Sequence, residues 1–203
     1  MKKSKNLDAI EEKIFKILVS LPVIIVSMIL LIGPSASGKT EIARALTRLF
    51  GIKKAVTHTT RAPRVGEVSG RDYHFVSKED FLDKKEKGGF VETTLYNGNY
   101  YGCSKEECAD DRCIVVDPQG LASFRALNDP RLVTFYLRCD EATRKARMES
   151  RGDEPKAILS RLENDAKAFD DEKLSICDFT LSTETKGIEE LAKEVYRLYK
   201  SRL

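Results

Sequence analysis

The segment at residues 33–40 constrains the fold of this chain more than any other. It reads Gly-Pro-Ser-Ala-Ser-Gly-Lys-Thr and fits the pattern G-x-x-x-x-G-K-[ST] at every fixed position. In that pattern the backbone N–H groups of a glycine-rich loop surround a polyphosphate, the lysine contacts its terminal phosphates and the hydroxyl binds Mg²⁺. The alternative is a chance match on a glycine-containing turn.

The segments on either side of the loop support the match. An apolar run at residues 23–32 precedes it, and residues 41–50 repeat apolar side chains at helical spacing until Gly51. The order strand, loop, helix places the loop at a helix N-terminus, where anions are favoured. We therefore predict a nucleotide-binding loop with Lys39 as a catalytic residue and Thr40 as a magnesium ligand, made of Gly33, Pro34, Ser35, Ala36, Ser37, Gly38, Lys39 and Thr40.

Length and charge favour one compact domain without a nucleic-acid or membrane partner. The chain has 203 residues, and its 35 basic and 32 acidic residues leave a net charge of only +3. Five cysteines, an odd number in a chain without a convincing export signal, indicate free thiols and a cytoplasmic location. Three of them, Cys103, Cys108 and Cys113, recur every five residues, which is not a usual zinc-ligand spacing.

The first 22 residues form a predicted helical extension. Residues 1–6 are basic and residues 18–32 are apolar, which raises the alternative of a signal peptide or a membrane anchor. The apolar run is shorter than the roughly 20 residues that span a bilayer, and Pro22 interrupts it. We predict instead an amphipathic helix at residues 7–20 that packs on the body or on a second copy, which leaves a homodimer open; its apolar face would contain Leu7, Ile10, Ile14 and Leu18.

Short apolar runs alternate with helical repeats along the rest of the chain, which predicts an α/β fold with a parallel sheet flanked by helices. The expected strands are residues 24–32, 113–116, 132–137 and 179–181. The expected helices are residues 141–149, 155–169 and 188–201. Residues 57–102 are rich in Thr, Arg, Gly and Tyr and predict a small inserted lobe of short strands over the carboxyl edge of the sheet, where ligands bind.

The inserted lobe carries a resemblance to a known family. The block THTTRAPRVGEVSGRDYHFV at residues 57–76 resembles the guanylate kinase family, as do GFVE at 89–92, YNGNYYG at 96–102 and DPQG at 117–120. The resemblance runs in unbroken order from residue 23 to about residue 185. It implies one P-loop kinase domain at residues 23–203, with a GMP-binding lobe at about residues 57–113 and a short lid at about residues 149–164. The implied reaction transfers the γ-phosphate of ATP to GMP with Mg²⁺, a step of purine nucleotide metabolism.

The resemblance also implies a role for individual residues. ATP would occupy the loop at residues 33–40. The residues that would bind GMP, through its phosphate or its guanine, are Thr57, Arg61, Arg64, Tyr73, Glu92, Tyr101, Cys103 and Asp117. The arginines that would contact the ATP phosphates as catalytic residues are Arg147, Arg151 and Arg161.

The chemistry of these side chains agrees with those roles. Arg61 and Arg64 form a fork suited to bidentate binding of a phosphate dianion. Guanine offers two adjacent N–H donors on its Watson–Crick edge, and a buried carboxylate at Glu92 would accept both, whereas adenine presents an acceptor there. Each residue also has a structural alternative, as a solvated loop charge or as ordinary packing. No side-chain base is required, so catalysis would depend on positioning and charge neutralisation, with the lobe and lid closing to exclude water.

Several positions depart from the family pattern. Val115 stands where the family usually has an acid, and Cys103 stands where it usually has a hydroxyl residue. The segment between Gly102 and Asp117 is about six residues short of the family pattern, the lid is about one residue short, and Ser182-Thr183 replaces the usual Asn-Asp near the adenine site. These changes would allow a slow or divergent enzyme.

Three other functions stay open at this stage. A kinase for another small phosphorylated acceptor would use the same loop, and a guanylate-kinase-like protein-binding module would share the fold with little activity. A GTPase would use residues 117–120 as its D-x-x-G motif, although no N-K-x-D motif accompanies it.

Overall fold

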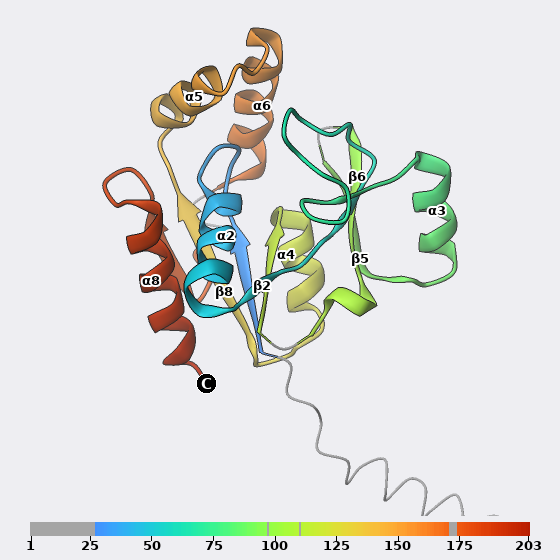
Figure 1. Ribbon diagram of the computed structural model, residues 1–203, viewed down its shortest axis with the longest axis horizontal. Coiled ribbons are helices and arrows are strands. Elements are labelled where there is room, and N and C mark those ends of the chain that lie inside the picture. The colour runs from blue at the N-terminus through green and yellow to red at the C-terminus, as the bar shows by residue number, and fades with distance from the viewer. Residues whose placement is uncertain (1–26, 97, 110, 171–173) are drawn as a thin grey trace, which may run out of the picture.

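The computed structural model describes residues 27–96, 98–109, 111–170 and 174–203. The predicted helix at residues 7–20 lies outside these ranges. Figure 1 shows a central sheet covered by helices, a smaller lobe on one side of it and a pair of helices above it. Within the described ranges, no helix combines the length and the apolar character needed to cross a membrane.

The central sheet is parallel, as the sequence predicts. Its five strands are β1 (Met28–Ile32), β2 (Lys53–Lys54), β7 (Arg112–Val116), β8 (Leu132–Arg138) and β9 (Phe179–Ser182), in the order β2-β7-β1-β8-β9. All neighbouring strands run parallel. Every residue of β1 is buried, as expected for a central strand with helices on both faces. The strand expected from residue 24 begins at Met28, the second described residue.

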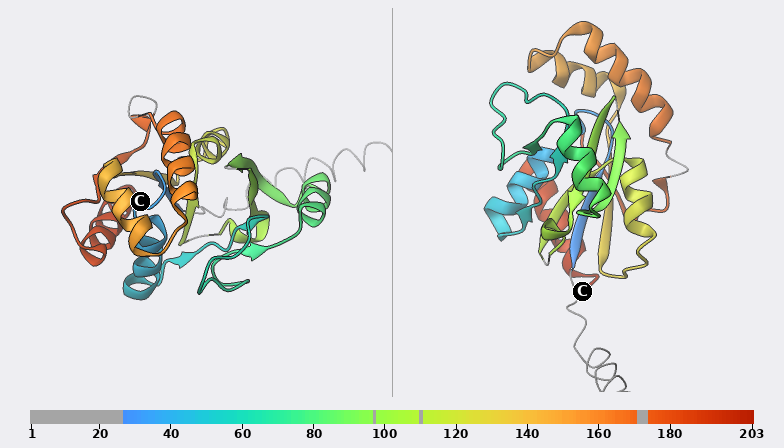
Figure 2. Two further views of the ribbon diagram at one scale, coloured as in Figure 1. Left: turned by 90° about the horizontal axis from the view of Figure 1, so that it is seen from above. Right: turned by 90° about the vertical axis from the view of Figure 1, so that its right-hand side faces the viewer.

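Alternation along β1 divides the core into two layers. Ile29 and Leu31 face α2 (Lys39–Phe50) and α8 (Ile188–Lys200), whereas Leu30 and Ile32 face α4 (Pro118–Arg125). The right-hand view of Figure 2 shows α2 and α8 on one side of the sheet and α4 on the other. The apolar stripe of α8 is buried against the sheet, so its predicted role in core packing is confirmed.

The inserted lobe contains a second sheet. Its strands are β3 (His58–Thr59), β4 (His74–Phe75), β5 (Phe90–Tyr96) and β6 (Asn99–Ser104), in the order β4-β3-β6-β5. The strands are short, as the sequence predicts, and β5 and β6 form an antiparallel hairpin. A short 3₁₀ helix, η1 (Lys105–Glu107), leads from this lobe back to the central sheet.

Two helices are absent from the sequence prediction. In the lobe, α3 (Lys78–Glu86) buries only Phe81, so it has almost no amphipathic pattern, although Ser77 caps its N-terminus with a 3.0 Å bond from the Asp80 N–H. The other helix, α4, follows directly after β7. Its N-cap Asp117 and its first residue Pro118 form a recognisable helix start.

The pair α5 (Glu141–Ser150) and α6 (Pro155–Ala168) matches the predicted helices of the lid region within a residue at each end. Met148, Ile158 and Leu162 form a small apolar cluster between them, and Ala36 of the phosphate loop packs against this cluster. The lid region therefore contacts the loop that it is expected to cover.

Candidate active site

The phosphate loop connects β1 to α2 and depends on two glycines of the motif. A Cβ atom on Gly33 would lie 2.6 Å from the Leu137 carbonyl oxygen and 2.7 Å from the Ser37 Oγ, so only glycine fits there. Gly38 has a φ of 94°, in the left-handed region that glycine adopts without strain, and it is the N-cap of α2. The loop therefore places the N-terminus of α2 at the carboxyl edge of the sheet, as the sequence predicts.

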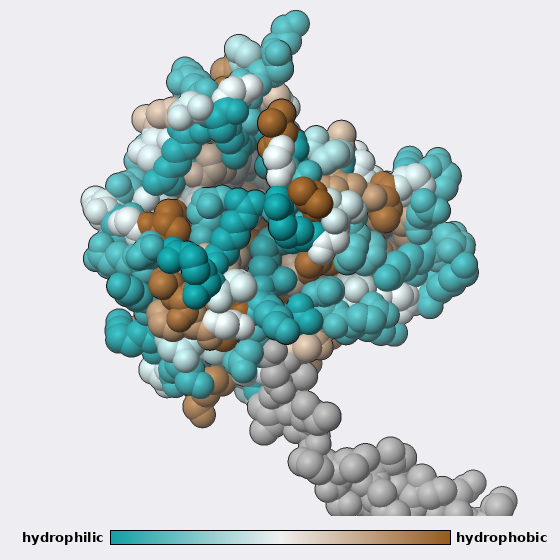
Figure 3. Space-filling view, viewed as in Figure 1, coloured by the Kyte–Doolittle hydropathy of each residue, from teal (hydrophilic) through white to brown (hydrophobic). Residues whose placement is uncertain are grey.

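A cavity of about 560 Å³ opens beside this loop, a size typical of small-molecule sites. The space-filling view shows mostly hydrophilic residues, with a few hydrophobic ones, around the hollow between the α5–α6 pair and the inserted lobe (Figure 3). The predicted site residues that line the cavity are Gly33, Ser35, Ala36, Gly38, Lys39, Thr40, Thr57, Arg64, Tyr73, Glu92, Tyr101, Asp117, Arg147 and Arg151. Segments from four separate parts of the chain thus meet at one cavity.

Lys39 lies at the centre of the loop. Its Nζ donates to the carbonyl oxygens of Gly33 and Pro34, both at 2.7 Å. Burial lowers the pKa of Lys39 to about 8; the Asp165 charge opposes this, and the nearby arginines add to it. An ammonium so poorly solvated gains strongly from a phosphate partner.

Glu92 lies on the opposite side of the cavity, on β5. Its Oε1 accepts the backbone N–H of Cys103 at 3.1 Å, whereas its Oε2 has no hydrogen-bond partner among the described residues. Burial, and then the charge of Asp117, raise the pKa of Glu92 to about 7. A buried carboxylate with a spare oxygen is suited to accept N–H groups from a ligand.

Asp117 and Thr57 complete this side of the cavity. The Oδ1 of Asp117 accepts the Gly120 N–H and its Oδ2 accepts the Thr94 hydroxyl, both at 2.7 Å. Asp117 therefore caps α4 and fixes that helix to β5, beside Glu92. Thr57 is buried and lines the cavity next to the lobe sheet.

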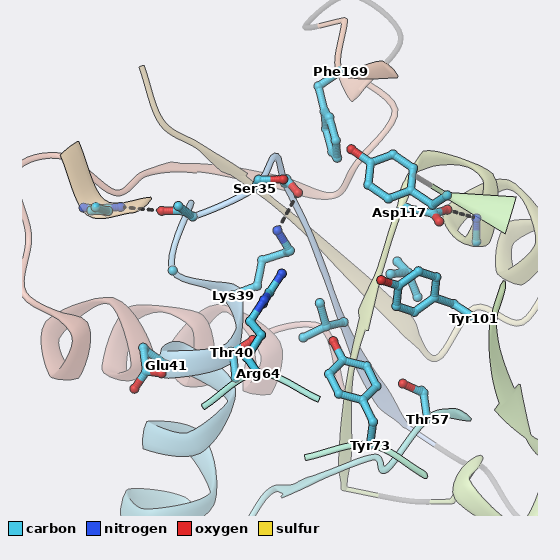
Figure 4. A pocket seen from close by; sticks show the side chains of 18 of the residues that line it. Ser35, Lys39, Thr40, Glu41, Thr57, Arg64, Tyr73, Tyr101, Asp117 and Phe169 are labelled. Carbon is cyan, nitrogen blue, oxygen red and sulfur yellow. Dashed lines mark hydrogen bonds between the residues drawn. The ribbon is translucent and has the colours of Figure 1, made fainter. Parts of the chain in front are cut away.

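Two tyrosines and an arginine occupy the space between Glu92 and the phosphate loop. Figure 4 shows the hydroxyls of Tyr73 and Tyr101 directed into the cavity, with Arg64 beside Lys39. Burial raises the pKa of Tyr73 to about 12, so its hydroxyl stays a neutral donor. Burial and the neighbouring guanidinium groups lower the pKa of Arg64. These donors surround a position suited to a phosphate.

Two predicted arginines do not line the cavity in this structure. Arg61 donates to both oxygens of Glu67, at 3.0 and 2.9 Å, and its guanidinium lies 5.4 Å from the ring centroid of Tyr73. Arg161 donates to Asp153, which also accepts the Arg151 Nε at 2.9 Å. Each arginine pairs with a carboxylate from its own segment. The sequence pattern predicts that these arginines bind phosphate, but it does not predict these pairs.

Cys103, Pro34 and Ser37 also lie outside the cavity lining. Cys103 and Ser37 are fully buried. Cys103 supports Glu92 through its backbone N–H, so its contact with the site is indirect. Ser37 packs beneath the phosphate loop, where its hydroxyl has no partner among the described residues.

Arg147 connects the lid region to the rest of the site. Its guanidinium donates to the Ala36 carbonyl oxygen at 3.1 Å and to the Thr183 carbonyl oxygen at 2.7 Å. The loop before α8 adds Lys186 and Gly187 to the cavity lining, which the sequence did not predict. This loop and Arg147 flank the phosphate loop on the side away from Glu92.

Sequence reasoning also missed a buried carboxylate, Asp165 of α6. Its Oδ2 accepts the Ser35 N–H at 2.8 Å and the Arg144 Nη1 at 2.9 Å, and its Oδ1 accepts the hydroxyl of Tyr96. Asp165 is 1% exposed and thus joins the phosphate loop, the lid region and the inserted lobe. Ser35 lies 130 residues away in the sequence, so no local pattern could have shown this contact.

The architecture itself defines the class of the protein. An intact phosphate loop at the carboxyl edge of a parallel sheet, a cavity beyond it and a helical pair above it define a P-loop kinase of small molecules.

Comparison with known proteins then identifies the family. The model of the guanylate kinase family matches residues 26–202. A guanylate kinase from Chromohalobacter salexigens is 36% identical over 141 residues, which are 66% of this chain and 66% of that relative. One from Nitratidesulfovibrio vulgaris is 35% identical over 148 residues, 69% of this chain and 72% of the relative. The chain belongs to the guanylate kinase family.

Solved structures agree with this assignment. The crystal structure of guanylate kinase from Anaplasma phagocytophilum superposes with a TM-score of 0.64 at 25% identity, covering 88% of this chain and 86% of that one. A shikimate kinase from Acinetobacter baumannii, bound to shikimate, is 15% identical with a TM-score of 0.50 and shares the fold alone. The P-loop kinase fold predicted from the sequence is confirmed.

The raised pKa of Glu92 predicts that GMP affinity depends on pH. If its ionised carboxylate accepts two guanine N–H groups, GMP binding lowers its pKa and releases a proton. GMP affinity should then rise with pH up to about 7 and level off above it. Calorimetric titration of GMP in buffers of different ionisation enthalpy measures the proton release.

Glu92→Gln is the matched control, because it keeps the shape and removes the titration. The GMP phosphate itself titrates at about pH 6. The GMP affinity of this variant should therefore keep only the pH dependence that comes from the phosphate. Equal proton release by the two proteins at pH 7 would contradict the assigned role of Glu92.

Proposed function

We propose that this protein transfers the γ-phosphate of ATP to GMP in the cavity between the phosphate loop and the inserted lobe, giving ADP and GDP. The observation that carries the proposal is the pairing, across one cavity, of an intact phosphate loop with the buried carboxylate Glu92, whose Oε2 lacks a partner among the described residues. A protein-binding module would need neither feature, and a kinase for a sugar phosphate would have no use for a base-reading carboxylate.

The lobe side of the cavity would bind GMP. Glu92 would accept the two N–H groups of the guanine edge, with Thr57 beside it. Tyr73, Tyr101 and Arg64 would hold the phosphate, where the tyrosines add donors without adding charge. Arg61 would join them by leaving Glu67 for the phosphate. Both partners are anions, but the phosphate carries more negative charge than the Glu67 carboxylate.

The loop side would bind ATP. The backbone N–H groups at the N-terminus of α2 would hold its phosphates, and Lys39 would exchange two carbonyl oxygens for phosphate oxygens. Arg147 and Arg151 line the cavity on the lid side and would neutralise the transferring phosphoryl group. Arg161 would join them as the lid closes and would leave Asp153. The acceptor oxygen of GMP is already ionised near neutral pH, so no side chain needs to remove a proton.

The described residues fit a magnesium ion held together with ATP. Thr40 lines the cavity at the start of α2, where its hydroxyl would bind the ion, and phosphate oxygens and water would supply the other ligands. When bound, the ion neutralises phosphate charge and orients the phosphates. Val115 adds no oxygen on that side, so the protein itself supplies few ligands.

We place the protein in the cytoplasm, where both nucleotides are available and where the five cysteines, all free in the structure, would stay reduced. Pairing of two copies through residues 7–20 stays a prediction. The domain boundaries, a helical extension at residues 1–22 and one kinase domain at residues 23–203, also stay a prediction.

A survey of acceptors tests the proposed function. ADP release should be fast with GMP, slower with dGMP and close to background with AMP, CMP, UMP or ribose phosphates. Lys39→Met, which keeps the length of the side chain without its charge, should lower turnover at least about a hundredfold in a folded protein. Equal rates with AMP and GMP, or an unaffected Lys39→Met variant, would rule out the assignment.

The separation of the two nucleotide sites gives a second prediction. Replacing Arg61 or Arg64 with Ala should raise the KM for GMP by about tenfold, the value of one charged hydrogen-bonded contact, with little change in the KM for ATP. Lys87→Ala is a matched control, because this exposed lysine of the same lobe pairs with Asp83 and lies outside the cavity lining. A comparable loss of ATP affinity in the arginine variants would contradict the division of roles.

Val115 gives a third prediction. Its side chain is half-buried and lines the cavity, so in Val115→Asp the carboxylate should lie close enough to the phosphate loop to assist Mg²⁺ binding. The magnesium concentration for half-maximal activity should fall, and turnover should rise several-fold, about 1 kcal/mol.

Val115→Asn keeps the shape of that aspartate without its charge and serves as the control. A magnesium titration beside a thermal melt separates the outcomes. Val115 also packs partly against the core. A less stable Val115→Asp protein with an unchanged magnesium midpoint would therefore show that the residue serves packing alone.

A further inference from the structure

Cys103 and Cys108 form a close thiol pair beside the proposed guanine pocket. Their Sγ atoms lie 3.5 Å apart, within hydrogen-bond distance. Cys103 is fully buried at the end of β6, whereas Cys108, directly after η1, is partly exposed. The pair therefore combines a fully buried cysteine with a less buried one, which suits a resolving and an attacking cysteine.

The electrostatics of the pair give the two thiols different roles. Their mutual hydrogen bond, followed by burial, raises the pKa of Cys103 and keeps it a thiol. The same bond lowers the pKa of Cys108, against the opposing effects of burial and of the Glu92, Glu107 and Glu106 charges, so Cys108 is the more acidic thiol of the pair. Thiolates, not thiols, react with peroxides and disulfides.

The pair is connected to the pocket on two sides. The backbone N–H of Cys103 donates to Glu92 at 3.1 Å, the bond that holds the proposed guanine-reading carboxylate. Glu107, which precedes Cys108, accepts the Val56 N–H at 3.0 Å, and Val56 precedes Thr57. A shift of residues 103–108 would therefore move both Glu92 and Thr57.

We propose that Cys103 and Cys108 form a reversible disulfide that weakens GMP binding. The inference rests on the proposed function, because it concerns regulation of the same acceptor pocket. In a disulfide the two sulfur atoms lie about 2.05 Å apart, so the pair must close by about 1.5 Å from its present 3.5 Å. Closing this gap shifts both ends of the segment, so the strain falls on η1, on the bond from the Cys103 N–H to Glu92 and on the bond from the Val56 N–H to Glu107.

The oxidation balances with a peroxide as oxidant. The Cys108 thiolate attacks one oxygen of hydrogen peroxide, which breaks the O–O bond, releases hydroxide and leaves a sulfenic acid. The hydroxide released in this step takes the proton of Cys103 to give water, and the Cys103 thiolate then attacks the sulfenic sulfur, forming the S–S bond and displacing hydroxide. A dithiol reductant returns both thiols by exchange.

The test uses the full chain before and after treatment with hydrogen peroxide. Peptide mass spectrometry should find a 103–108 disulfide, and calorimetry should find GMP affinity reduced by about tenfold, as expected when one buried hydrogen bond to Glu92 is lost, with ADP affinity unchanged. Dithiothreitol should restore the affinity. Absence of the disulfide, or a disulfide without loss of GMP affinity, overturns the inference.

Two variants make the result specific. Cys108→Ser should bind GMP like the reduced protein and should keep that affinity after peroxide treatment. Cys177→Ser, which removes a buried thiol outside the pair, should still lose GMP affinity on oxidation. Equal sensitivity of Cys108→Ser and the unmodified protein overturns the inference. Failure of the reduced, unmodified protein to bind GMP would instead contradict the proposed function.

Discussion

Concentrated positive charge around the phosphate loop is the constraint on which the rest of the site depends. The desolvated ammonium of Lys39 has Arg144, Arg64 and Arg151 as neighbours, and each of these charges lowers its pKa further. Like charges gathered around one cavity repel one another, so this cluster costs free energy unless anions accompany it. Carboxylates offset part of this charge: Asp165 acts on Lys39, while Glu67 and Asp153 hold arginines at the edge of the cavity. Two nucleotides would supply the remaining negative charge.

This charge balance explains why the site is built from separate parts of the chain. Lys39 lies on the core and Arg64 on the inserted lobe, while Arg147 and Arg151 lie on the lid region. Asp165 connects the three parts through the Ser35 N–H, Arg144 and the Tyr96 hydroxyl. We propose that substrate phosphates draw the same parts closer together, because each phosphate attracts cations from more than one of them.

Features set by local sequence were predictable, and features set by distant contacts were not. The loop at residues 33–40 follows from its motif, and α5, α6 and α8 follow from their apolar spacing. The helix α3 does not, because only Phe81 is buried and the lobe provides its packing. The family resemblance predicted Glu92 and Arg64, which both line the cavity, but no local pattern showed that Asp165 contacts Ser35 across 130 residues. Pairings of that kind depend on the tertiary fold.

A measurement of the distance between the lobe and the lid region tests most directly whether substrate phosphates draw these parts together over the cavity. Val65 of the lobe and Leu159 of α6 are both exposed, and dyes attached there through non-natural amino acids leave the five cysteines untouched. Fluorescence energy transfer between the two dyes rises as their distance falls. It should increase on addition of a bisubstrate analogue that joins adenosine and guanosine through a polyphosphate, and GMP alone should produce a smaller increase. Unchanged transfer at saturating analogue, with binding verified by calorimetry, would contradict the claim that substrate phosphates draw these parts together.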